Sequence, residues 1–106
     1  MARAASDYYE RGKAAWLSDP EARAHYERER REIEQIDAVI RSLDQLRVDA
    51  GISKTELARR IGRNPSSIRR LFTAQTARPE LPLIVSIADE LGARVAITAL
   101  PRAAQR

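Results

Sequence analysis

Cysteine is absent from the 106-residue chain, and histidine occurs only once, as His25. Without thiols the chain can form neither disulfides nor a cysteine-ligated zinc site, and a lone histidine makes a poor metal site. The sequence also lacks a glycine-rich loop that could cradle a phosphate and a second histidine that could share acid–base chemistry. We therefore predict that the protein is not an enzyme and that it binds no metal or cofactor.

Long apolar runs are absent as well. No stretch approaches the roughly 20 apolar residues that a membrane-spanning helix needs, and residues 1–7 lack the apolar core of a signal peptide. Hydrophobic residues make up 43% of the chain and charged residues 32%, which is typical of a folded helical protein. We expect one small cytoplasmic protein that does not enter a membrane.

Positive charge is concentrated in one part of the chain. The net charge is +4, but residues 53–78 alone carry +6, because seven basic side chains accompany the single acidic residue Glu56. Residues 1–35 and 36–52 each carry −1, and residues 79–106 are balanced. The seven basic residues are Lys54, Arg59, Arg60, Arg63, Arg69, Arg70 and Arg78. A local basic patch of this kind indicates a surface that meets nucleic acid.

A long helical region is predicted from residue 20 to residue 50. Asp19 can cap the first free N–H groups, Pro20 fits the first helical position, and Glu21 suits the positive end of the helix dipole. Further along, apolar side chains recur at steps of three and four residues, which predicts one buried stripe. That stripe consists of Ile33, Ile36, Ile40, Leu43 and Leu46. The pattern allows either one continuous helix or two helices that break near residue 34.

Two short helices with a tight turn between them are predicted next. Ser53 and Glu56 have the spacing of a capping box, and Gly62 can supply a left-handed stop. Asn64 can cap the following helix, whose first position Pro65 occupies. The side chains predicted to face the core are Leu57, Ala58, Ile61, Ile68, Leu71 and Phe72. A further helix is expected from near residue 82 to residue 92.

Residues 94–100 form a β-branched run that Pro101 ends, which predicts a short strand. A lone strand cannot satisfy its own backbone hydrogen bonds. It must therefore pair with a copy of itself, with another chain, or with a segment not identified as a strand. We predict that Val95, Ala96 and Ile97 pair across a homodimer.

The segment from Leu43 to Leu91 resembles the Xre/Cro-like helix-turn-helix family. The matching sequences are GISKTELARRIG at 51–62, NPSSIRRL at 64–71 and IADELG at 87–92. The resemblance implies an all-α fold with a helix-turn-helix DNA-binding domain at 36–92. From the residues around that domain we also expect an N-terminal helical extension at 1–35, a dimerisation strand at 93–101 and a flexible tail at 102–106. The expected partner is double-stranded DNA with a palindromic operator.

In this family the first helix of the pair lies across the sugar-phosphate backbone and the second enters the major groove. Many members have a polar, base-reading residue where this chain has Pro65, and often Glu-Gly where it has Phe72-Thr73. We therefore expect base recognition to shift to Ser66, Ser67, Arg69 or Arg63, with Arg69 on a guanine and Arg70 on phosphate. The other reading is that the arginines are ordinary surface charges. The complete set of predicted DNA-binding residues is Lys54, Thr55, Arg63, Asn64, Ser66, Ser67, Arg69 and Arg70.

The flanking segments are similar to those of HigA-type antitoxins. LSDPE at 17–21, Tyr26 and RVAI at 94–97 carry this resemblance. It implies an autoregulating repressor that also neutralises a ribonuclease-like toxin. The candidate partner-binding residues are Tyr8, Tyr9, Trp16, Leu17 and Tyr26, although these side chains could instead pack on the protein's own helices. Two alternatives are a free-standing Xre-family regulator with no toxin partner and an adaptor that has lost DNA binding, which the basic patch argues against.

Overall fold

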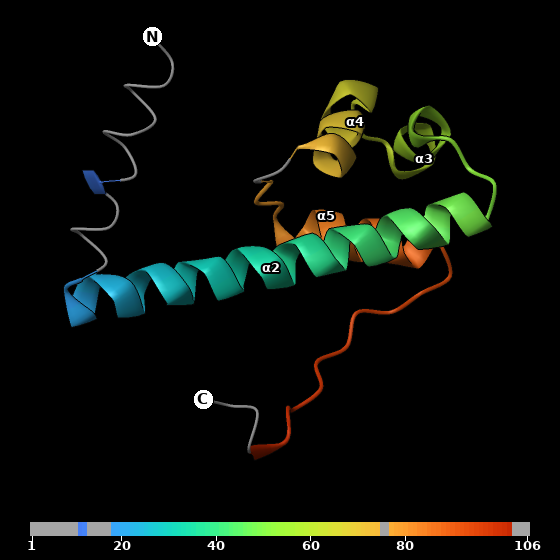
Figure 1. Cartoon of the computed structure of the whole chain (residues 1–106). Helices are drawn as coiled ribbons and strands as arrows, with labels where there is room; N and C mark the ends of the chain where they lie inside the picture. The colour runs from blue at the N-terminus through green and yellow to red at the C-terminus, as the bar shows by residue number, and fades with distance from the viewer. Residues whose placement is uncertain (1–10, 13–17, 75–76, 103–106) are drawn as a thin grey trace, which may run out of the picture. The chain divides into compact units, whose positions relative to one another are not determined.

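The computed structural model describes residues 11–12, 18–74 and 77–102. Its elements are α2 (Pro20–Asp49), α3 (Lys54–Ile61), α4 (Pro65–Thr73) and α5 (Leu81–Glu90), and within these residues the regular structure is helical, as predicted (Figure 1). The chain divides into two compact units, residues 1–36 and residues 37–106. Across the described ranges, no helix is both long and apolar enough to cross a membrane.

The long helical region is one continuous helix, which decides between the two sequence-based alternatives. Asp19 caps α2 by accepting a hydrogen bond from the Glu21 N–H (3.2 Å). Near its start the helix is charged and exposed, with an ion pair between Arg30 and Glu34 (3.2 Å). The buried side chains of α2 are Ile40 and Leu43, both in the second unit. Of the predicted stripe, Ile40 and Leu43 therefore reach the core, whereas Leu46 is exposed, which corrects the prediction.

Helices α3 and α4 begin where the capping signals predict, and α3 also ends as predicted. Ser53 Oγ accepts a hydrogen bond from the Glu56 N–H (3.0 Å), and Asn64 Oδ1 accepts one from the Ser66 N–H (2.8 Å). Gly62 ends α3 in the left-handed region with φ of 68°. The capping box is only half formed, which corrects the prediction. The Glu56 carboxylate accepts hydrogen bonds from arginines on its own helix rather than from the Ser53 N–H.

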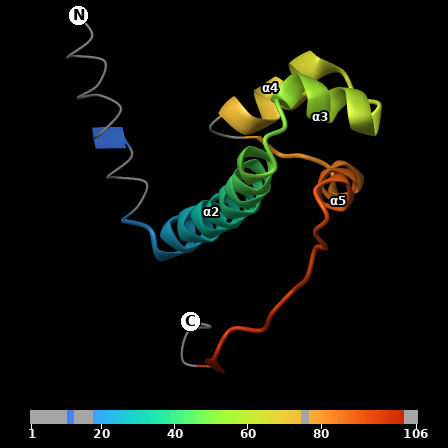
Figure 2. The ribbon, with the colours of Figure 1, turned by 90° about the vertical axis from the view of Figure 1, so that its right-hand side faces the viewer.

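The core of the second unit lies where three short helices meet. Leu57 of α3, Ile68 of α4 and Ile87 of α5 are all completely buried. Ile40 and Leu43 of α2 are also buried. Figures 1 and 2 show α3 and α4 together on one side of α5, and α3 packs against both of the other short helices. Burial of each large apolar side chain contributes roughly 1.5–3 kcal/mol, so these few residues hold α4 in place.

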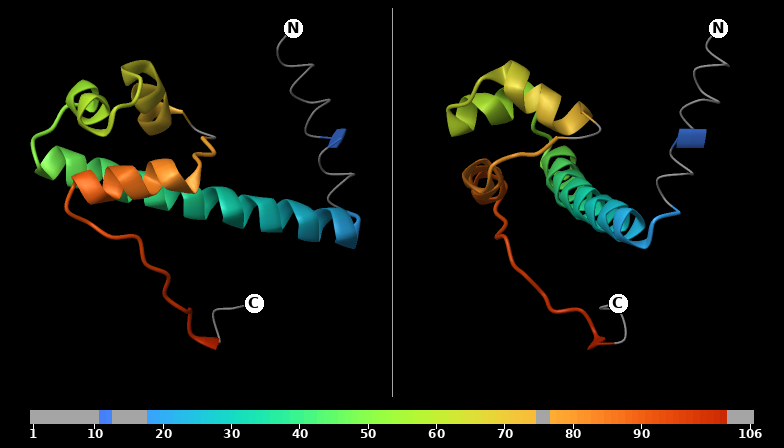
Figure 3. Two further views of the ribbon diagram at one scale, coloured as in Figure 1. Left: turned by 180° about the vertical axis from the view of Figure 1, so that it is seen from behind. Right: turned by 90° about the vertical axis from the view of Figure 1, so that its left-hand side faces the viewer.

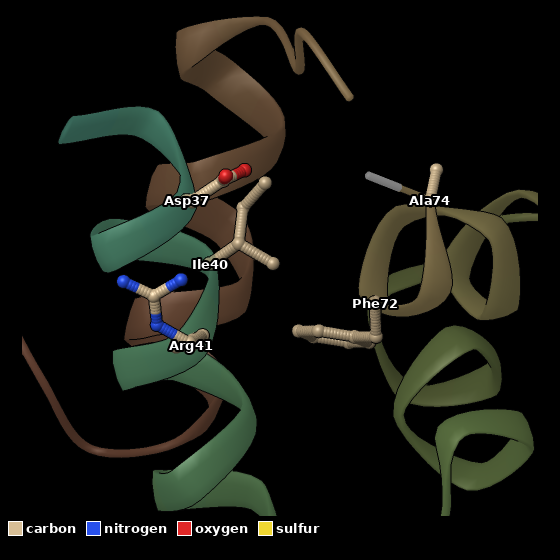
Figure 4. A pocket seen from close by; sticks show the side chains of 5 residues that line it. All are labelled: Asp37, Ile40, Arg41, Phe72 and Ala74. Atoms are coloured by element: carbon tan, nitrogen blue, oxygen red, sulfur yellow. The ribbon is translucent and has the colours of Figure 1, made fainter. Parts of the chain in front are cut away.

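One half-buried arginine links the end of α2 to the rest of the second unit. Arg47 donates to the Ile52 carbonyl oxygen (2.7 Å) and to Asp44 Oδ1 (2.9 Å), and its guanidinium lies 5.8 Å from the centre of the Phe72 ring. Phe72 is only half-buried, because its ring borders an open pocket of about 440 Å³ between α2 and the end of α4. Figure 4 shows the ring directed across this pocket toward Ile40. The half-buried Phe72 corrects its prediction as a core residue, and no pattern in the sequence predicted the contacts of Arg47.

The predicted strand at 94–100 is not a strand in this structure. Gly92, with φ of 74°, redirects the chain after α5, and the following segment extends away from the helices (Figures 1 and 3). Ile97 is 98% exposed. A strand is defined by hydrogen bonds to a neighbour, and the described part of a single chain places no such ladder beside residues 93–101. The β-branched pattern favours a strand, but among the residues that the structure describes the segment has no neighbouring strand to pair with.

Candidate nucleic-acid interface

The first turns of α3 and α4 bring three of the predicted DNA-binding side chains together. Arg69 Nη1 donates to Thr55 Oγ1 (3.4 Å), and Arg69 Nη2 donates to Ser66 Oγ (3.3 Å). All three side chains are exposed. The structure therefore joins residues 14 positions apart in sequence into one polar cluster, which we call the Arg69 cluster (Thr55, Ser66 and Arg69).

The remaining predicted residues lie around this cluster in different settings. Lys54 is half-buried as the first residue of α3, and Arg63 lies exposed in the turn. Asn64 is the N-cap of α4, so its side-chain oxygen already accepts a hydrogen bond. Ser67 and Arg70 are exposed on α4. Their contact with DNA stays a prediction, but all are on α3, on α4 or in the turn between them.

Glu56, the single acidic residue in the basic stretch, pairs with two of the seven basic side chains. Glu56 accepts hydrogen bonds from Arg59 Nε (2.9 Å) and Arg60 Nε (3.0 Å). Arg60 Nη1 also lies 3.6 Å from Oε1 of Glu90 in α5. The hydrogen bonds from Arg59 and then Arg60 lower the pKa of Glu56 to about 2. The same carboxylate raises the pKa of Arg59. Arg59 and Arg60 are thus partly neutralised within the protein.

The other five basic residues form no ion pair with a carboxylate among the described residues. They are Lys54, Arg63, Arg69, Arg70 and Arg78. All of them are exposed except Lys54, which is half-buried. Cations without a carboxylate partner beside a helix N-terminus attract phosphate, because the free N–H groups there also point toward an anion. The electrostatic surface available to a polyanion is therefore smaller than the +6 count, and it is centred on α4.

The comparison with protein families agrees with this architecture, which consists of two short capped helices, a glycine turn between them and a third helix packed against the first of them. The model described as "Helix-turn-helix domain" matches residues 41–100, which is more than half of the chain. The chain belongs to this helix-turn-helix domain family. No curated protein and no solved structure matched the chain. The family match supports the Xre-like helix-turn-helix resemblance.

Within this helix-turn-helix domain, α3 has the position of the first helix of the pair and α4 the position of the recognition helix. In such domains the recognition helix enters the major groove with its N-terminal residues against the bases, while the first helix crosses the backbone. The Arg69 cluster lies at the N-terminal turns of both helices, where that geometry brings bases and phosphates together. Pro65 occupies the first position of α4 and has no N–H to donate.

Arg78 is counted in the basic patch but is not among the predicted DNA-binding residues. Arg70 and Arg78 line the same hollow of about 360 Å³, between α4 and the start of α5. Both side chains are exposed, so an anion in this hollow would meet two guanidinium groups. The signal that could have identified Arg78 was its position at the end of the +6 stretch.

Most of the candidate partner-binding residues cannot be placed. Tyr8, Tyr9, Trp16 and Leu17 lie outside the described residues. Tyr26 is half-buried on the part of α2 that belongs to the first unit. Their predicted role therefore enters below only as a proposal.

Proposed function

We propose that this protein is a sequence-specific transcriptional repressor that places α4 in the major groove of an operator. The observation that carries this proposal is the Arg69 cluster, which presents an exposed guanidinium one turn into the recognition helix. Arginine in this position can donate two parallel hydrogen bonds to O6 and N7 of guanine, the commonest specific contact in the major groove. Repression follows from occupancy, because a protein seated on a promoter excludes the polymerase.

In this proposal the other basic residues bind the phosphates of the DNA backbone. Phosphate contacts fix register and orientation, whereas base contacts supply sequence preference. Lys54 at the start of α3 and Arg70 on α4 would bind the backbone on either side of the Arg69 contact. Arg78 would add a contact near the start of α5. Neighbouring bases would be contacted by the short side chains of Ser66 and Ser67 and by Arg63 in the turn.

A homodimer completes this function, because two recognition helices can then address a palindromic operator. Its support is a groove of about 300 Å³ between α2, α5 and residues 93–96, lined by apolar side chains that include Leu43, Ile84 and Val95. Ile97 lies exposed beside this groove. In the dimer, residues 95–97 of each copy would pair as strands and supply the missing ladder. Half-sites about one DNA turn apart, roughly 34 Å, would follow.

The experiment is a selection from a random-sequence duplex library, followed by affinity measurements at several salt concentrations. If three of the five unpaired basic residues contact phosphate in each protomer, a dimer makes about six contacts, and log K should fall with log salt at a slope near −5. A recovered motif with two similar half-sites would support the proposal. An affinity that is independent of salt, or a selection that enriches no motif, contradicts it.

We further propose that the first unit makes this repressor the antitoxin of a ribonuclease-like toxin. The support is that residues 1–36 are a compact unit of their own and that residues 1–35 carry a net charge of −1, unlike the basic stretch. Such a unit can meet a basic partner while the helix-turn-helix remains on DNA. Trp16, Leu17 and Tyr26 would provide the apolar anchors that contribute most of the affinity.

Co-expression with the product of a neighbouring ribonuclease-like reading frame tests the antitoxin role. We expect the wild type to rescue growth and Trp16→Ala with Leu17→Ala to lose rescue while still binding the operator. The matched control is Arg69→Ala, which should lose operator preference and keep rescue. Rescue by the double variant at the wild-type level would contradict this role and favour a free-standing Xre-family regulator.

A further inference from the structure

The hydrogen bonds of Arg69 connect the two helices of the DNA-binding pair. Thr55 lies in the first turn of α3 and Ser66 in the first turn of α4, yet both hydroxyl oxygens accept from the same guanidinium. One of these bonds is local, since Ser66 is three residues before Arg69. The bond to Thr55 is not local, so the arginine's direction depends on how α3 and α4 pack.

The position of Thr55 is itself well defined. The Ser53 cap fixes the first turn of α3, and Leu57, two residues after Thr55, is completely buried in the core. A threonine side chain also has few available rotamers, because it branches at Cβ. The Thr55 hydroxyl therefore has few positions available to it, and a long, flexible arginine can be oriented against it.

The two hydrogen bonds leave Arg69 able to bind a base. A guanidinium has five N–H donors, and Thr55 and Ser66 take one each, so three remain. A bidentate contact to guanine uses two. Holding the side chain in advance also lowers the ordering cost that binding would otherwise impose on a long side chain.

We propose that Thr55 is a positioning residue for sequence specificity: it orients Arg69 toward a guanine, rather than binding phosphate itself. This inference rests on the proposed DNA-binding function, and it gives Thr55 an indirect role in place of the direct DNA contact predicted from the sequence. It places part of the specificity of the recognition helix on the helix that precedes it. Loss of the Thr55 hydroxyl then affects discrimination between bases and leaves charge-driven affinity for DNA intact.

The test compares Thr55→Val, which keeps the branched shape without the hydroxyl, with Thr55→Ser, which keeps the hydroxyl. The probes are a duplex of about 30 base pairs selected by the wild type and the same duplex with the guanine at the Arg69-dependent position replaced by adenine. Arg69→Ala identifies that position as the one where preference is lost, by about 5- to 150-fold. Circular dichroism confirms that each variant is folded.

We expect Thr55→Val to reduce the preference for guanine by about 2- to 10-fold, which is the range for one side-chain hydrogen bond. Thr55→Ser should restore the preference, and the salt slope should not change in either variant. In the Arg69→Ala background, Thr55→Val should have no further effect, because there is no guanidinium left to orient.

Two results would overturn the inference. One is an equal loss of affinity for both duplexes that persists in the Arg69→Ala background, which assigns Thr55 to phosphate. The other is full guanine preference in folded Thr55→Val, which shows that Ser66 or packing orients Arg69 without it. Both leave the proposed function standing. A wild type that selects no motif instead removes the proposed function, and this inference with it.

Discussion

Replacing Arg47 by methionine should remove the link between α2 and the recognition helix while keeping an aliphatic stem of similar length. The Ile52 carbonyl loses a hydrogen bond of 2.7 Å in a half-buried setting, at a cost of about 1–3 kcal/mol. The pair with the half-exposed Asp44 and the contact with the Phe72 ring contribute up to about 1 kcal/mol each. Because these contributions overlap, we expect a loss of about 2–3 kcal/mol.

Such a loss is large for this chain, because a domain of its size is stable by about 5–15 kcal/mol in total. Urea unfolding followed by circular dichroism at 222 nm gives the change in free energy of unfolding. The matched control is Arg30→Met, which breaks an exposed ion pair on the same helix and should cost less than about 0.5 kcal/mol. If the two variants lose the same small amount, the contacts of Arg47 do not stabilise the fold, and the reasoning is refuted.

The remaining predictions concern the pKa of Glu56, the left-handed backbone at Gly62 and the proposed strand pairing at Ile97. Hydrogen bonds from Arg59 and Arg60 lower the pKa of Glu56 to about 2 in the folded protein. As the pH drops, the Glu56 carboxylate is therefore protonated first in the unfolded chain, and the free energy of unfolding should fall between about pH 4.5 and pH 2. Glu56→Gln should flatten this part of the curve of unfolding free energy against pH, and an unchanged curve contradicts the assignment. Gly62→Ala places a Cβ at φ of 68° and should cost about 1 kcal/mol in the same urea assay, whereas Gly12→Ala in the first unit should be nearly neutral. Ile97→Pro removes a ladder N–H, and sedimentation should show monomers where the wild type is dimeric at micromolar concentration; a monomeric wild type rules out the proposed pairing.

The helices of the second unit could be predicted because their signals are local. A cap such as Ser53 or Asn64 acts on N–H groups two or three residues away, and a glycine such as Gly62 relieves strain at its own φ angle. The apolar spacing within α3 and α4 then fixes which faces are buried. These rules need no knowledge of the rest of the chain, so the sequence alone determined the helix-turn-helix and the stretch that carries its charge.

Local signals misled the prediction where a residue had two possible partners. Glu56 has the spacing to complete a capping box, but it also has arginines three and four residues ahead on its own helix. A hydrogen bond between two ionised groups is stronger than one from a neutral N–H to the same carboxylate, so Glu56 pairs with Arg59 and Arg60. Residues 94–100 likewise have the composition of a strand, but a strand requires a neighbour that composition cannot supply.

The tertiary structure decided everything that depends on separated residues meeting. Thr55 and Arg69 are 14 positions apart, and no periodicity places one hydroxyl beside one guanidinium. Arg47 looks like any surface arginine in the sequence, yet packing at the end of α2 buries it against Asp44, the Ile52 carbonyl and Phe72. The sequence by itself determined that a basic helix-turn-helix forms. Only the packing of α3 on α4 decided that Arg69 is held by Thr55, because that packing sets a distance between two side chains that local rules leave free.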